Sequence, residues 1–244
     1  MRRIGLLGGT SWQSSSHYYS QLNEGVQARL GGLRSADLVL RSVDFADVAA
    51  LQSAGDWAAL GAMYEREGAQ LRAGGAELVG ILANTMHLVH DQVARGSGLP
   101  VVHVVDVVAD AVVDLGVERV GLLGTRFTMA SQELYPARLA ARGVGTIVPT
   151  GADAVEVDRV IYEELALGRV LDSSRASYAA IIGRLVEQGA QAIVLGCTEL
   201  SMLVPPDDPA FSPVPLLDST ALHVHALLDA ALAPQASSLE EGAA

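Results

Sequence analysis

The sequence predicts an α/β fold of two similar, pseudo-symmetric lobes, each a mainly parallel sheet flanked by helices. Short β-branched runs alternate with longer alanine-rich segments, which is the alternation that gives parallel strands joined by crossover helices. Of the 244 residues, 50% are hydrophobic and 18% are charged, so a sizeable core can form. An internal repeat then divides the chain into two related halves.

The expected elements follow in order along the chain. Apolar runs of strand length lie at residues 38–40, 78–82, 101–105, 119–123 and 192–195, and another strand precedes the loop at Gly8. Alanine-rich segments of helical length lie at residues 14–30, 56–74, 86–95, 106–115, 130–142, 153–167 and 173–188. A last helix is expected after Leu217, and the tail after Pro234 is expected to be frayed.

The repeat consists of three segments that recur in the same order at a nearly constant offset. The pairs are residues 3–8 with 119–124, 75–82 with 189–196, and 100–106 with 213–218. Chance recurrence in a chain rich in Gly, Ala, Leu and Val would not keep this order. We therefore expect one lobe from residues 1–105 with 217–244, a second from 106–216, and the active site in the cleft between them.

Composition excludes several classes of function. A net charge of −12 and a pI near 4.8 leave no basic surface for nucleic acid. All 16 basic residues are arginine, so a pyridoxal aldimine, a Walker phosphate loop and a Schiff-base aldolase have no lysine to use. The longest apolar runs are too short to span a membrane. We expect a small-molecule partner, with no nucleic acid and no membrane.

Cys197 is the only cysteine, so an intrachain disulfide is impossible. The chain also lacks a charged-then-apolar leader at its start, which favours a cytoplasmic location. Cys197 follows a buried strand at an expected helix start, with Thr198 and Glu199 behind it. Because a helix N-terminus lowers the pKa of a thiol, we expect a thiolate here that serves as base or nucleophile. The alternative is a buried cysteine that acts as a small hydrophobic residue.

Four loops that follow expected strands are dense in hydroxyl and amide groups. Their candidate ligand-binding residues are Thr10, Ser11, Asn84, Thr85, Thr125, Thr198 and Glu199. Backbone N–H groups at helix N-termini suit a compact carboxylate better than a large cofactor. The spacing Gly5-x-x-Gly8-Gly9 is not a dinucleotide fingerprint, so no cofactor is expected.

Because the chain contains no lysine, a side chain that pairs with a bound anion must be arginine or histidine. Arg41 beside Ser42 and Arg126 beside Thr125 are the candidates. His87 is a further candidate substrate-binding residue and the first candidate for a second base. No carboxylate-rich cluster completes a metal set around the histidines, so no metal is expected.

Taken together, these loops resemble the cofactor-independent aspartate/glutamate racemase family, in its aspartate and broad-specificity amino-acid branch. The motifs that carry the resemblance are Gly8-Gly9-Thr10, Tyr18-Tyr19-x-x-Leu22-Asn23, Ser42-Val43-Asp44-Phe45, Asn84-Thr85-Met86-His87, Gly124-Thr125 and Gly196-Cys197-Thr198-Glu199. The resemblance covers nearly the whole chain. It implies two α/β lobes around a cleft, no metal or pyridoxal, a homodimer, and two cysteines on opposite faces of the substrate α-carbon.

The chain departs from that pattern at Ala83, which pairs with Cys197 across the repeat. The family carries cysteine, or sometimes threonine, at this position, and alanine cannot move a proton. Three explanations stand open: an engineered replacement that traps ligand, a natural member that racemises poorly or through another group, and a one-cysteine member with different chemistry. Arylmalonate decarboxylases of the same superfamily, which use a single cysteine, are a precedent for the third.

The sequence therefore indicates an amino-acid racemase-family protein that uses thiol acid–base chemistry at the α-carbon of a small amino acid, with aspartate or glutamate expected first. Its activity would be impaired by Ala83. The alternatives are a one-cysteine decarboxylase or isomerase of the same superfamily, and a non-catalytic protein that binds small carboxylates.

Overall fold

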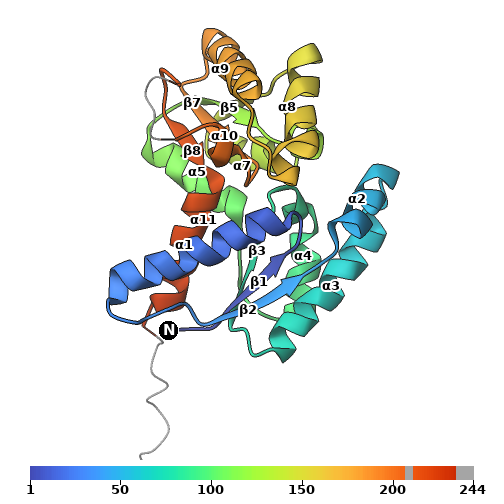
Figure 1. Cartoon of the computed structure of the whole chain (residues 1–244), viewed down its shortest axis with the longest axis vertical. Helices are drawn as coiled ribbons and strands as arrows, with labels where there is room; N and C mark the ends of the chain where they lie inside the picture. The colour runs from blue at the N-terminus through green and yellow to red at the C-terminus, as the bar shows by residue number, and fades with distance from the viewer. Residues whose placement is uncertain (207–210, 235–244) are drawn as a thin grey trace, which may run out of the picture.

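The computed structural model describes residues 1–206 and 211–234 and contains two parallel four-stranded sheets (Figure 1). The first sheet has the order β2-β1-β3-β4, from Leu38–Ser42, Ile4–Gly8, Leu78–Ile81 and Val101–Val102. The second has the order β6-β5-β7-β8, from Gly145–Ile147, Arg119–Leu123, Ala192–Leu195 and Leu216–Asp218. Since the two orders are equivalent, the predicted fold of two similar parallel sheets flanked by helices is confirmed.

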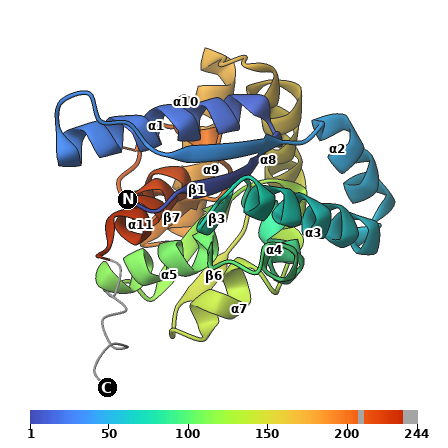
Figure 2. The same cartoon turned by 90° about the horizontal axis from the view of Figure 1, so that it is seen from below.

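Helices cover both faces of the first sheet. Its elements are α1 Trp12–Leu30, α2 Phe45–Ala54, α3 Trp57–Ala73, the 3₁₀ turn η1 Thr85–Val89 and α4 His90–Ser97. Ile4 and Leu6 of β1 pack toward α1, whereas Leu7 packs toward α3 and α4. The helices α3 and α4 lie side by side (Figure 2). They approach closely at Gly96, where an added Cβ would meet the Glu65 carbonyl oxygen at 1.9 Å.

The second sheet is covered in the same way. The helices after β4 are α5 Val104–Asp114, α6 Arg126–Ala130, α7 Tyr135–Ala140, α8 Gly151–Glu163, η2 Leu165–Leu167, α9 Asp172–Glu187, α10 Leu200–Leu203 and, packed on the first sheet, α11 Ser219–Leu232. Leu123 and Leu195 pack toward α8 and α9, while Leu122 and Val194 pack toward α5 and α7. Alternate residues of each strand are thus buried against opposite helix layers, as in other parallel sheets.

Two helices are exchanged between the halves. α5 follows a strand of the first sheet, but Val105 and Val108 belong to the core of the second. α11 follows a strand of the second sheet, but Leu227 and Leu228 pack in the core of the first. This exchange supports the lobes that we propose, with the chain crossing near residue 105 and returning near 217. The frayed tail expected after Pro234 lies outside the described residues.

Two expected elements differ from the structure. The strand expected at 101–105 ends at Val102, because the imidazole of His103 accepts a hydrogen bond from the Val105 N–H and starts α5 at Val104. The helix expected at 130–142 is shorter: α6 ends at Ala130, and α7 covers only Tyr135–Ala140, with Pro136 in its first turn. Two elements, α2 and β6, were not expected.

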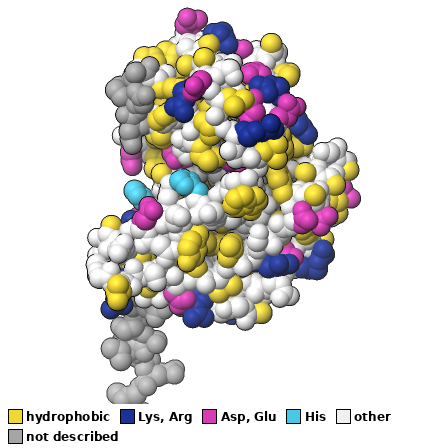
Figure 3. Space-filling model, in the orientation of Figure 1, with side chains coloured by type: hydrophobic (Ala, Val, Ile, Leu, Met, Phe, Trp, Pro, Cys, Tyr) yellow, Lys and Arg dark blue, Asp and Glu magenta, His cyan; other side chains and the backbone are white. Residues whose placement is uncertain are grey.

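The arginines on the surface lie among carboxylates. On the face shown in Figure 3 the two charge types are interspersed, and several are paired, as in Arg184 with Asp153 at 2.7 Å. Within residues 1–206 and 211–234, no helix combines the length and the apolar character that crossing a bilayer requires.

Candidate active site

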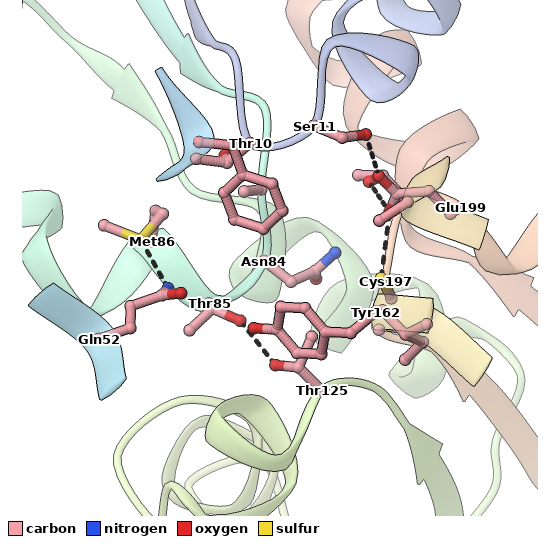
Figure 4. Close-up of a pocket in the computed structure, with 16 residues that line it drawn as sticks. Thr10, Ser11, Gln52, Asn84, Thr85, Met86, Thr125, Tyr162, Cys197 and Glu199 are labelled. Carbon is pink, nitrogen blue, oxygen red and sulfur yellow. Dashed lines mark hydrogen bonds between the residues drawn. The ribbon is translucent and has the colours of Figure 1, made fainter. Parts of the chain in front are cut away.

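The candidate site is a pocket at the carboxyl ends of β1, β3, β5 and β7, lined by residues from both halves (Figure 4). Nine of the expected site residues line it: Thr10, Ser11, Ala83, Asn84, Thr85, Thr125, Cys197, Thr198 and Glu199. Its cavity measures about 40 Å³, room for a few water molecules.

The centre of the site is Cys197, which follows β7 and is 8% exposed. Its thiol donates to the Glu199 carboxylate, with Sγ 3.1 Å from Oε2. Burial, together with the charge of Glu199, raises the pKa of Cys197 well above its ordinary range. The expected thiolate at a helix start is therefore wrong for the resting state. Thr198 and Glu199 form a turn, and α10 begins only at Leu200 and has 4 residues.

Glu199 accepts hydrogen bonds from three side chains of the site. Ser11 Oγ donates to Oε1 at 2.6 Å, and Thr198 Oγ1 donates to Oε2 at 2.6 Å beside the Cys197 thiol. Ser11 belongs to the first half, so Glu199 joins the two halves. Gly9 shapes the Ser11 loop: its φ is +103°, and an added Cβ would meet the Val43 carbonyl oxygen at 2.2 Å. A side chain at residue 9 would displace this loop.

Hydroxyl and amide groups line the floor of the pocket. The Thr85 hydroxyl lies 3.0 Å from that of Thr125, which links the ends of β3 and β5. Asn84 accepts from the Tyr135 hydroxyl at 2.6 Å and donates to Ser219 Oγ at 3.0 Å. These bonds fix the Asn84 amide and leave one of its N–H groups for a ligand.

Ala83 occupies the position equivalent to Cys197. It comes two residues after β3, as Cys197 comes two residues after β7, and the two strands hold the same place in their sheets. Both residues line the pocket. In the first half the residue equivalent to Glu199 is Thr85. The two faces of the pocket therefore differ: one carries a thiol with a carboxylate partner, and the other carries neither.

Aromatic side chains that sequence reasoning missed close the pocket. Phe45 of α2 stacks on Tyr162 of α8, with ring centroids 6.2 Å apart and planes at 18°. Trp57 of α3 and Phe127 of α6, which are not lining residues, meet edge-on at 5.9 Å. The other lining residues that were missed are Gln52, Met86, Ile161 and Ala166. Only the unexpected α2 brings Phe45 and Gln52 to the site.

Neither candidate arginine lines the pocket. Arg41, at the exposed end of β2, pairs with Glu67. Arg126 pairs with Asp158 at 2.8 Å and lies 5.4 Å from the Tyr162 ring centroid. Asp158 also accepts from the Arg126 backbone N–H, so this guanidinium is held at the rim.

His87 is likewise not a lining residue, and both nitrogens of its ring form hydrogen bonds within the protein. Its Nε2 accepts from the Val104 N–H at 3.2 Å, so its Nδ1 must carry the proton that it donates to the Ala83 carbonyl oxygen at 3.0 Å. Burial and the nearby His103 and His223 lower the pKa of His87 well below 6.5. The structure does not favour His87 as the second base.

Acidification is expected to destabilise the fold through these buried histidines. Burial lowers the pKa of His103 to about 3 and that of His223 to about 4. The unfolded chain therefore takes up protons that the folded chain refuses, and stability present above pH 6.5 is lost as the pH falls. Between pH 6.5 and 5, His223 alone is expected to cost about 2 kcal/mol, and His87 and His103 act in the same direction.

Urea unfolding at pH 7.5 and pH 5 measures this loss. His223→Gln is expected to reduce the pH dependence, whereas His225→Gln, an exposed position on the same helix α11, is expected to leave it unchanged. An unfolding free energy that stays constant between the two pH values would contradict the prediction.

Comparison with known proteins gives consistent findings. The family model described as Asp/Glu/Hydantoin racemase matches residues 7–227. A Yersinia pestis protein assigned by name to the Asp/Glu racemases is 41% identical, with a TM-score of 0.85 over 95% of this chain and 100% of its own. An aspartate racemase homologue from Pyrococcus horikoshii OT3 is 30% identical, with a TM-score of 0.79 over 95% and 99%. Arylmalonate decarboxylase shares the fold at 16% identity, with a TM-score of 0.52 over 96% and 94%.

Proposed function

Because the chain belongs to the Asp/Glu/Hydantoin racemase family, we propose that it acts at the α-carbon of an amino acid by proton transfer at Cys197. The observation that carries this proposal is the buried Cys197–Glu199 pair, 3.1 Å apart, in a pocket lined by both halves. Aspartate and glutamate are the first substrates to test, because the relatives are named for them. The chain contains no lysine, so no pyridoxal aldimine can form, and we propose thiol chemistry without that cofactor. The resemblance further suggests a cytoplasmic homodimer.

The Cys197–Glu199 pair can supply a base although the resting group is a thiol. The thiol proton passes to Glu199 Oε2, which leaves a thiolate next to a carboxylic acid. The thiolate then takes the α-proton, and the charge that develops on the substrate carboxylate is stabilised by hydroxyl donors such as Thr85 and Thr125. Returning the proton from the same sulfur restores the starting configuration. Exchange with solvent, rather than inversion, is the expected outcome on this face.

One enantiomer is therefore expected to exchange its α-hydrogen much faster than the other. The reason is that Cys197 serves one face and Ala83 offers no group on the opposite face. Proton NMR in D₂O, run separately on the D and L forms of aspartate and glutamate, measures exchange, and chiral chromatography of the same samples measures racemisation. The proposal predicts rapid loss of one α-proton signal with very slow racemisation. Rapid racemisation from both enantiomers would require a second base opposite Cys197 and would contradict the one-base mechanism.

A single thiol that rests in its protonated form also suits the protonation of an enediolate after decarboxylation. The raised pKa of Cys197 and the absence of a group at Ala83 favour this second candidate. Incubation with a substituted malonate distinguishes it, since loss of CO₂ with formation of one product enantiomer would support a decarboxylase. Binding with neither exchange nor decarboxylation would indicate a non-catalytic carboxylate-binding protein.

A further inference from the structure

One end of the pocket is built around a neutral amide. Gln52 of α2 lies there next to Met86 of η1, across the pocket from Cys197 and Glu199 (Figure 4). Gln52 is 5% exposed, and its Nε2 donates to the Met86 sulfur at 3.3 Å. Its Oε1 is buried and has no hydrogen-bond partner within the described part of the chain. An unpaired buried acceptor is costly, so a ligand group that donates to this oxygen would be favoured.

The orientation of this amide follows from its neighbour. In the observed orientation the Gln52 Nε2–H donates to the Met86 sulfur, which is a weak acceptor. Turning the amide over would place Oε1 against a thioether that has no proton to donate. The acceptor therefore faces the pocket, and the donor faces Met86.

Positive charge is absent from the lining. Of the described residues around the pocket, Glu199 alone has a charged side chain, and its charge is negative. Arg126 is paired with Asp158, and Arg41 with Glu67. A carboxylate buried beside Gln52 would therefore lack a cationic partner. Its oxygens, which only accept hydrogen bonds, would also face Gln52 Oε1, which is itself an acceptor.

We propose that the Gln52 end of the pocket selects an uncharged substrate side chain with a terminal hydrogen-bond donor, as in glutamine or asparagine, over the carboxylates of glutamate and aspartate. A carboxamide N–H donates to Gln52 Oε1, while Met86 contacts the methylene groups. This inference rests on the proposed function, since it places the α-carbon at Cys197 and the side chain toward Gln52.

The test compares ligands of similar length that differ at the side-chain end. Titration calorimetry at pH 7.5 with both enantiomers of glutamine, glutamate and methionine is expected to show glutamine bound at least about tenfold more tightly than glutamate. Gln52→Leu removes the acceptor and keeps the side-chain size, so it is expected to weaken glutamine binding about tenfold and to change methionine binding little. Gln70→Leu makes the same exchange at an exposed position of α3 and is expected to change neither.

The outcomes separate this inference from the proposed function. Glutamate binding at least as tight as glutamine binding, equal weakening of all three ligands in Gln52→Leu, or no binding of any of them would overturn the inference. If Gln52→Leu fails to fold, the comparison of glutamine with glutamate on the unmodified chain decides. A preference for glutamine that depends on Gln52, but without α-hydrogen exchange, would contradict the proposed function and leave the inference standing. Exchange with a preference for glutamate would do the reverse.

Discussion

Replacing Ala83 with cysteine is expected to raise the rate of racemisation by about 10²–10⁴-fold, the usual contribution of a positioned general acid–base group. Ala83 and Cys197 occupy equivalent places after β3 and β7, and both line the pocket. The introduced thiol would give the second face a group that moves protons. It would stand two residues from Thr85 instead of a glutamate, so no neighbouring carboxylate at that position would oppose its ionisation.

The control for Ala83→Cys is Ala83→Ser, which adds an atom of similar position but leaves a hydroxyl that is a far weaker acid. Racemisation in this variant is expected to stay near that of the unmodified chain. The measurement is chiral chromatography from each enantiomer in parallel, with exchange followed by NMR. A folded Ala83→Cys protein that exchanges one enantiomer as before and still does not racemise would contradict the equivalence of the two positions.

The parts of the fold that the sequence predicted depend on local pattern. The repeat at residues 3–8 and 119–124 predicted two related sheets, and β1 and β5 now hold the same place in them. The missed helix α2 has a start signal in the sequence, because Asp44 is its N-cap and accepts from the Ala46 N–H. β6 has only 3 residues, too few for alternation or an apolar run to stand out.

The parts of the site that sequence reasoning missed depend on tertiary neighbours. Motifs placed nine expected residues at the pocket, but the raised pKa of Cys197 comes from burial and from a contact with Glu199. That Gln52 Oε1 is buried without a hydrogen-bond partner in the described part of the chain can be recognised only from the atoms around it. The sequence also does not indicate that the Arg126 guanidinium forms an ion pair with Asp158, a residue 32 positions away in the chain.

Cys197→Ala is expected to reduce α-hydrogen exchange to the background rate, because it removes the one group proposed to touch the α-proton. Cys197→Ser is the matched variant: it keeps the size of the side chain, but a serine hydroxyl is too weak an acid to give its proton to the Glu199 carboxylate and supply the alkoxide. Both should still bind ligand by calorimetry, since Asn84, Thr85 and Thr125 are unchanged, and retained binding separates lost chemistry from lost structure.

The pH profile gives an independent check. The thiolate of the proposed mechanism forms when a proton moves within the Cys197–Glu199 pair, so its population does not depend on pH while the pair holds that proton. Because the pKa of Cys197 is raised well above its ordinary range, exchange should change little between pH 7 and 8. Exchange that persists in Cys197→Ser would assign the proton transfer to another group, and a tenfold rise between pH 7 and 8 in the unmodified chain would contradict proton transfer within the pair.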